Sequence, residues 1–195
     1  MIPPITLIKI NCPRCGNNIS SKIVETPDYE MSIQLPFEIS QCVKCNFIYT
    51  RVRPDYKTLF SFFYPDNYLC YGVQRNPLAA FIDQQRMQKQ ALQRYHLIKE
   101  SVPSTHFKVL EVGCATGEFL KVCLQHGNEA HGIEPNQALA DSLRKSGVNV
   151  INSTLEDAEC GGNSFDLICL FNVFEHLWDS VASLRKLNSL LKPGG

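Results

Sequence analysis

The stretch that decides the fold is Val109-Leu-Glu-Val-Gly-Cys-Ala-Thr-Gly117, an apolar run with one acid that leads into a glycine turn. Such a turn brings the backbone close to a ligand at the carboxyl edge of a parallel sheet. A dinucleotide fingerprint does not fit, because its three glycine positions fall on Gly113, Ala115 and Glu118. A P-loop does not fit either, because no Lys-Ser/Thr pair follows. Glu111, inside the strand, would repel a pyrophosphate but tolerate a ligand with an ammonium group.

Strand and helix patterns alternate on both sides of this turn. We expect strands at 107–112, 129–134, 148–151 and 165–171, and helices at 118–126, 136–146 and 181–191. Asn136 is the expected N-cap of the middle helix, and Gly147 its stop. The strand at 165–171 is apolar enough for burial on both faces. The order predicts an α/β fold with a Rossmann-like, doubly wound parallel sheet of about four strands.

Glu134 ends the second expected strand, 21 residues after Gly113. An acid at this place in a nucleotide-binding sheet accepts hydrogen bonds from both hydroxyls of a ribose. A glutamate at a strand end is, by itself, more often a solvated loop charge. Together with the glycine turn at this spacing, Glu134 predicts ribose binding.

From Phe107 to Gly195 the sequence resembles class I S-adenosylmethionine-dependent methyltransferases. Five motifs in the expected order carry the resemblance: Val109-Leu-Glu-Val-Gly-Cys-Ala-Thr-Gly117, Gly132-Ile-Glu-Pro135, Ser164-Phe-Asp-Leu-Ile168, Val173-Phe-Glu-His176 and Leu191-Lys-Pro-Gly-Gly195. Each motif is weak alone, and the spacing of all five makes the resemblance specific. It implies S-adenosyl-L-methionine as the cofactor.

The resemblance also implies where the cofactor lies. The glycine turn would hold the methionine part, the acid after the second strand the ribose, and the segment after the third strand the adenine. The implied contacts are Glu111, Gly113, Cys114, Ala115 and Gly117 at the turn, Glu134 and Pro135 at the ribose, Leu155 and Glu156 at the adenine, and Asn172 near the methyl group. Ala115 stands where the family often has glycine, a mild departure.

Glu175 and His176 are the candidates for catalysis. They follow the fourth expected strand, on the edge where the acceptor would meet the methyl group. Methyl transfer requires a positioned nucleophile and removal of its proton, and histidine titrates near neutrality. The alternative is that this Glu-His pair only begins a loop and helix, as in family members that methylate oxygen.

Two cysteine pairs, Cys12-Pro-Arg-Cys15 and Cys42-Val-Lys-Cys45, lie near the N-terminus. Each gap lets two thiolates face one ion, so the four predict a tetrahedral zinc site. Four sulfurs fill the coordination shell, which predicts a structural Zn²⁺. A redox pair would open a helix in a thioredoxin-like unit, and Pro36 and the alternating pattern around it disfavour this alternative.

These patterns predict three regions. Residues 1–53 form the zinc-binding module, with short alternating strands between the cysteine pairs. Residues 54–101 form an aromatic-rich connector and an amphipathic helix from Leu78 to Ser101. The aromatic residues either pack between modules or form a lid or substrate wall. Residues 102–195 form the cofactor-binding domain.

The N-terminal module resembles that of sugar C-methyltransferases and related polysaccharide-biosynthesis methyltransferases, in which it helps to close the substrate site. This resemblance implies a small-molecule acceptor. An RNA methyltransferase that grips RNA with the zinc module is a second interpretation, but residues 1–60 hold seven Lys and Arg against five acids, which disfavours nucleic acid. A non-catalytic zinc-ribbon binding protein is a third interpretation, against which the intact cofactor motifs argue.

The composition of the 195 residues sets further expectations. The formal net charge is zero, and no apolar run reaches a membrane span. The start shows no signal peptide, so we expect the cytoplasm, where thiols stay reduced. The family sheet has seven strands in the order 3-2-1-4-5-7-6, of which we count four. We therefore expect an incomplete, inactive domain with 165–171 as an edge strand; the oligomeric state stays open.

Overall fold

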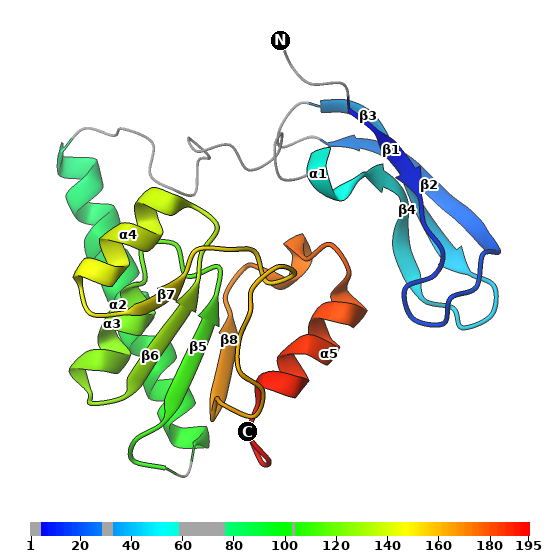
Figure 1. Cartoon of the computed structure of the whole chain (residues 1–195). Helices are drawn as coiled ribbons and strands as arrows, with labels where there is room; N and C mark the ends of the chain where they lie inside the picture. The colour runs from blue at the N-terminus through cyan, green and yellow to red at the C-terminus, as the bar shows by residue number, and fades with distance from the viewer. Residues whose placement is uncertain (1–4, 29–32, 59–76, 103) are drawn as a thin grey trace. The chain divides into compact units, whose positions relative to one another are not determined.

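The computed structural model describes residues 5–28, 33–58, 77–102 and 104–195. The chain divides into two compact units, Met1–Pro65 and Asp66–Gly195, which Figure 1 shows as an antiparallel sheet and an α/β body. Most of the predicted aromatic connector (Phe60, Phe62, Phe63, Tyr64, Tyr68 and Tyr71) lies outside the described residues.

The first unit is a four-stranded antiparallel sheet. Its elements are β1 (Leu7–Lys9), β2 (Ser20–Asp28), β3 (Ile33–Cys42), β4 (Ile48–Pro54) and the short helix α1 (Tyr56–Thr58), with the strand order β1-β4-β3-β2. The strands between the cysteine pairs, β2 and β3, are nine and ten residues long, so the short strands that we predicted are wrong in length. Both strands carry register shifts, which interrupt the alternation that the sequence pattern reports.

The second unit contains a parallel sheet with the order β7-β6-β5-β8. Its strands are β5 (Lys108–Val112), β6 (Glu129–Ile133), β7 (Asn149–Ile151) and β8 (Leu167–Leu170). Its helices are α2 (Pro77–Ser101), α3 (Glu118–Gln125), α4 (Gln137–Lys145) and α5 (Ser180–Leu190), with a 3-10 helix η3 (Phe174–His176) before α5. The predicted Rossmann-like sheet of four parallel strands is confirmed, with most ends within one or two residues of those expected.

Helices cover both faces of this sheet (Figure 1). Successive residues of β5 point to opposite faces. Val109 joins a core with residues of α2, α3 and α4, and Leu110 joins a second core with Leu187 and Leu190 of α5. The carboxyl ends of β5, β6 and β8 therefore meet at one edge between two packed layers.

Local signals in the sequence fix the ends of α4. The Asn136 side chain accepts a hydrogen bond from the Leu139 amide at 3.0 Å, as expected of an N-cap. Gly147 follows the helix with a φ of 88°, a conformation that favours glycine. Both predictions are confirmed.

One prediction of burial holds in part and one is wrong. Both faces of β8 pack against the two cores, as predicted, although only Cys169 is buried and its neighbours in the strand are half-buried. The C-terminal half of α2 packs through Ala91 and Tyr95, whereas Phe81 and Ile82 of its first half are 58% and 57% exposed. Among the described residues, no helix has the length and hydropathy of a membrane span.

Candidate functional site

The glycine turn after β5 has three residues in the left-handed region, with φ of 65° at Gly113, 46° at Ala115 and 67° at Gly117. A Cβ on Gly113 would lie 2.7 Å from Cγ2 of Val173, and one on Gly117 would overlap the Leu143 side chain. Both glycines are therefore favoured by φ, and a Cβ at either position would also displace a neighbouring side chain. Ala115 has the same left-handed backbone conformation but carries a Cβ. Alanine at this position, where the family often has glycine, therefore costs backbone strain energy.

Glu134 follows β6 at the same edge and is only 1% exposed. Its Oε2 accepts the Ala115 amide at 2.8 Å, and its Oε1 accepts the Asn136 amide at 2.8 Å. Burial raises the pKa of this carboxyl, and the two amides counteract the rise. Because each carboxylate oxygen has two lone pairs, both can also accept a hydroxyl from a ligand. The structure thus joins the turn and the predicted ribose acid in one cluster.

Glu111 is the buried acid of the turn, with 5% exposure. Within the described part of the chain its Oε2 has no hydrogen-bond partner. Burial raises its pKa to about 8, against the lowering effect of Arg94 and with a further rise from Glu134. A buried carboxylate oxygen without a partner is costly. Its chemistry fits a ligand that brings an ammonium or sulfonium group to the turn.

Arg94 is a site residue that the sequence reasoning missed. It lies on α2, and its guanidinium carbon is 4.1 Å from the centre of the Phe171 ring. Its charge also acts on the Glu111 carboxyl. The signal was present in the sequence, because Ala91, Arg94 and Tyr95 lie on one helical face, and a cation on the packed face of a helix indicates a buried partner.

The segment after β7 is fixed by its own side chains. Leu155 is buried in the core that α5 covers. The Glu156 carboxylate accepts the Trp178 amide at 3.1 Å, and the Asn152 amide nitrogen donates to the carbonyl oxygens of Glu134 and Pro135, both at 2.9 Å. The predicted adenine segment is thus attached both to Glu134 and to the chain that follows η3.

The candidates after β8 lie in and beside η3. Asn172 is exposed with a φ of 56°, and Glu175 and His176 are exposed within the 3-10 helix. The close approach of Val173 to Gly113 brings this segment to the glycine turn. The predicted catalytic and cofactor residues therefore share one edge of the sheet.

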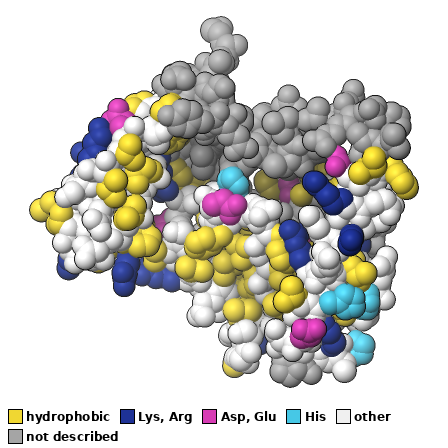
Figure 2. All heavy atoms as spheres, turned by 180° about the vertical axis from the view of Figure 1, so that it is seen from behind, with side chains coloured by type: hydrophobic (Ala, Val, Ile, Leu, Met, Phe, Trp, Pro, Cys, Tyr) yellow, Lys and Arg dark blue, Asp and Glu magenta, His cyan; other side chains and the backbone are white. Residues whose placement is uncertain are grey.

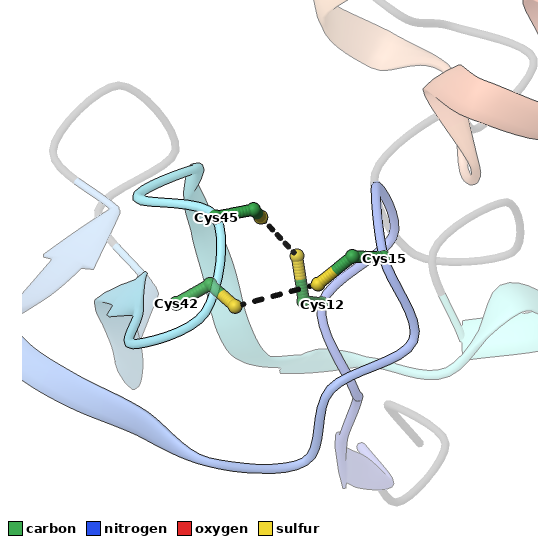
Figure 3. A group of neighbouring side chains, drawn as sticks. All are labelled: Cys12, Cys15, Cys42 and Cys45. Carbon is green, nitrogen blue, oxygen red and sulfur yellow. Dashed lines mark hydrogen bonds between the residues drawn. The ribbon is translucent and has the colours of Figure 1, made fainter.

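The four cysteines of the first unit form one cluster (Figure 3). Their sulfurs all lie within 4.8 Å of one another, and the Cys12–Cys45 and Cys15–Cys42 pairs are each 3.6 Å apart. Four sulfurs at about 2.3 Å from a tetrahedral Zn²⁺ would lie about 3.8 Å apart. All four cysteines are free thiols. The donor set and its spacing fit one tetrahedral ion.

The two cysteine turns have the same hydrogen bonds. In the first turn the carbonyl oxygen of Cys12 accepts a hydrogen bond from the Gly16 amide at 2.8 Å. In the second turn the carbonyl oxygen of Cys42 accepts one from the Asn46 amide at 3.0 Å. Gly16 and Asn46 both have positive φ, of 73° and 58°. Two matching turns present two pairs of sulfurs to one centre, as Figure 3 shows.

The thiols of this cluster have displaced pKa values. Burial raises the pKa of Cys42, but the amides of Cys45 and Lys44 and the Asn17 side chain outweigh it and lower that pKa to about 6. The Phe47 amide lowers the pKa of Cys45, but burial and the neighbouring thiols raise it to about 12. Four crowded thiols cannot all ionise without a cation to compensate them.

Comparison with known proteins defines the class. The sequence family described as "Methyltransferase domain" matches residues 71–195, which is more than half of the chain. The chain therefore belongs to the methyltransferase-domain family. The match includes the glycine turn, Glu134 and η3.

Individual relatives are more distant. The chain is 30% identical over 109 residues to a ubiquinone biosynthesis O-methyltransferase of Saccharophagus degradans, covering 52% of this chain and 46% of the relative. It is 30% identical over 100 residues to the enzyme of the same name from Cereibacter sphaeroides, covering 48% and 40%. A TehB-like SAM-dependent methyltransferase of Corynebacterium glutamicum has a TM-score of 0.48 at 21% identity, covering 62% of this chain and 71% of that one. The chain thus spans less than half the length of these two sequence relatives.

Proposed function

We propose that the protein transfers a methyl group from S-adenosylmethionine to a small-molecule acceptor. The observation that carries the proposal is the cluster of Glu111, Glu134 and the strained turn at one sheet edge. Membership of the methyltransferase-domain family supports it. Relatives named ubiquinone biosynthesis O-methyltransferase support a small molecule as the kind of acceptor.

The cofactor site would be built from the turn outward. Glu111, with Arg94 near it, would face the charged methionine end, and the backbone of 113–117, which includes Cys114, would surround it. Glu134 would accept the ribose hydroxyls with Pro135 beside it, and Leu155 and Glu156 would lie toward the adenine. The bound cofactor supplies an electrophilic methyl group on a sulfonium.

His176 would remove a proton from the acceptor, with Glu175 and Asn172 beside it at the methyl end. The exposure of His176 at the edge that the turn occupies supports this role. In the full-length enzyme, His176→Asn should lower turnover about 10²–10⁴-fold and leave S-adenosylhomocysteine affinity nearly unchanged. Glu175→Gln is the matched variant in the same 3-10 turn, and its loss should be smaller. Turnover of His176→Asn within threefold of the unsubstituted protein would assign His176 a structural role.

The cysteine cluster would hold one structural Zn²⁺, because Cys12, Cys15, Cys42 and Cys45 supply four sulfurs and leave no position for a substrate. Free thiols of this kind suit a reducing compartment, so we propose the cytoplasm. The first region, residues 1–53, would serve as the zinc module and 102–195 as the cofactor domain, joined by 54–101.

The finer proposal for the acceptor is a nucleotide-linked sugar, from the resemblance of the cysteine module and the segment after it. On the face that Figure 2 shows, Lys and Arg side chains form small separate groups, and Asp and Glu side chains lie between them. The test is transfer of a labelled methyl group from S-adenosylmethionine to three probes: a nucleotide-linked keto-deoxysugar, a catechol and a transfer RNA. Labelling of the sugar alone supports the finer proposal. Labelling of the catechol alone contradicts the sugar but keeps a small-molecule acceptor, and labelling of RNA alone contradicts both.

A further inference from the structure

We infer that Glu156 is a positioning residue that couples the cofactor-binding end of β6 to the segment carrying His176. It would act through loop 152–158, which runs between these two places in the second unit. The inference rests on the proposed function for its meaning, because it assumes that Glu134 binds the cofactor and His176 serves catalysis. The contacts that carry it are independent of that assumption.

The first contact holds the loop to β6. The Asn152 side chain donates to the carbonyl oxygens of Glu134 and Pro135, both at 2.9 Å. The Glu134 amide in turn donates to the carbonyl oxygen of Ile151 at 3.0 Å. A shift of Glu134 when its carboxylate binds a ligand would therefore move the start of the loop.

The second contact holds the loop to the segment after η3. Oε1 of Glu156 accepts the amide of Trp178, two residues beyond His176, at 3.1 Å. A carboxylate that accepts a backbone N–H forms a stronger hydrogen bond than a neutral acceptor does. The His176 amide donates to Val173 at 2.9 Å, so this short turn is closed on one side by its own backbone and held on the other by Glu156.

The loop between these contacts is fixed in place. Leu155 and Ala158 are both buried in the core that α5 covers, and Leu177 packs against the same core. The Lys186 ammonium donates to the carbonyl oxygens of Glu156 and Ala158 at 3.0 and 2.6 Å. The loop therefore supplies a contiguous chain of packed side chains and hydrogen bonds between its two ends, which is the kind of network that carries energetic coupling.

Glu156 was the residue that the family resemblance placed beside the adenine. Its Oε1 accepts the Trp178 amide, so the side chain has a structural partner whether or not it also reaches the cofactor. A carboxylate has lone pairs for both contacts. Substitution separates the two roles, because loss of a cofactor contact weakens binding, whereas loss of the Trp178 contact loosens the segment.

The test uses Trp178, which is the single tryptophan of the chain, as an intrinsic probe. In Glu156→Ala, acrylamide quenching of the indole should rise about twofold or more. In the unsubstituted protein, S-adenosylhomocysteine should change the indole emission of Trp178. In Glu156→Ala it should still bind within about fivefold of the unsubstituted affinity by calorimetry, but this change in emission should disappear. Glu156→Gln keeps an acceptor for the Trp178 amide and should restore both signals. Glu159→Ala removes an exposed glutamate of the same chain segment and should change neither.

Two results would overturn the inference. One is an indole signal in Glu156→Ala that matches the unsubstituted protein. The other is a large loss of S-adenosylhomocysteine affinity with unchanged quenching, which would make Glu156 a cofactor ligand. If Glu156→Ala does not fold, exchange of the Trp178 amide in the unsubstituted protein decides, because an amide without protection contradicts the contact. Failure of the unsubstituted protein to bind S-adenosylhomocysteine would instead defeat the proposed function, and the quenching comparison would still test the inference.

Discussion

The two units of this chain are stabilised in different ways. The first has a small core, in which Cys12, Cys42 and Tyr49 are the buried members, while five aliphatic side chains stay 47–61% exposed: Ile19, Ile23, Val24, Val43 and Ile48. The second has two hydrophobic cores, one on each face of a parallel sheet. If the four clustered cysteines bind zinc as proposed, the metal does in the first unit what many apolar residues do in the second.

The largest expected effect is the loss of the metal. Binding of structural Zn²⁺ to small modules contributes about 10–16 kcal/mol and is coupled to their folding. Purified protein should contain about one zinc per chain, and replacing Cys12, Cys15, Cys42 and Cys45 by serine should remove it. Hydrogen exchange should then become fast in residues 5–58 and stay slow in residues 104–195.

Cys160→Ser provides the control for that experiment, because Cys160 is half-buried and lies outside the cluster. It should keep the zinc and the exchange pattern. A four-serine variant that retains zinc, or a first unit that stays protected without it, would remove the contrast between the units.

The next effect concerns the buried acid of the second unit. The pKa of Glu111 rises from an ordinary 4.5 to about 8, chiefly through burial. Between these values the folded chain binds more protons than the unfolded chain, so stability should fall as the pH rises from about 4.5 to 8. The shift corresponds to roughly 3–5 kcal/mol. Urea unfolding at pH 5.5 and pH 8 should show this loss, and Glu111→Gln should abolish most of it.

Asp141→Asn is the comparison for this pH dependence. Asp141 is exposed, and its hydrogen bonds with Gln137 and Arg144 lower its pKa. The stability that it contributes is therefore lost only below its ordinary pKa, so the substitution should not alter the slope between pH 5.5 and pH 8. An equal slope in Glu111→Gln and the unsubstituted protein would show that Glu111 is not the source.

A smaller effect separates packing from backbone strain in the turn. Gly117 and Gly147 have φ of 67° and 88°, but only at Gly117 would a Cβ meet another side chain, that of Leu143. Gly147→Ala should cost about 1–2 kcal/mol for its backbone conformation. Gly117→Ala should cost about 1–3 kcal/mol more for overpacking. Chemical denaturation measures both, and equal losses would mean that Leu143 moves aside freely.

The parts that were predictable from sequence are those with local or periodic causes. The strands beside Gly113, the cap at Asn136 and the cysteine turns all follow from spacing along the chain. Exposure was harder to predict. The apolar pattern of α2 predicts a packed face along the whole helix, but Phe81 and Ile82 in its first half are exposed. Burial depends on which elements lie beside a helix and not on its own apolar residues alone.

The site contacts that the sequence did not indicate are long-range pairs. Trp178 and Glu156 are 22 residues apart, and the Glu111 carboxyl feels Arg94 from another element. A side chain that bonds a distant backbone amide leaves no periodic signal. The residue types at the site were therefore predictable, and their partners required the fold.

The most direct test of the cofactor site is calorimetric titration of S-adenosylhomocysteine into the unsubstituted protein and Glu134→Ala. In the proposed site, the substitution would remove the charged acceptor of two ribose hydroxyls, at a cost on the order of 1.5–3 kcal/mol. Glu159→Ala, in an exposed loop, should bind as the unsubstituted protein does. We predict that Glu134→Ala weakens affinity roughly ten- to hundredfold. Unchanged affinity in a folded Glu134→Ala would contradict the assignment of this sheet edge as the cofactor site.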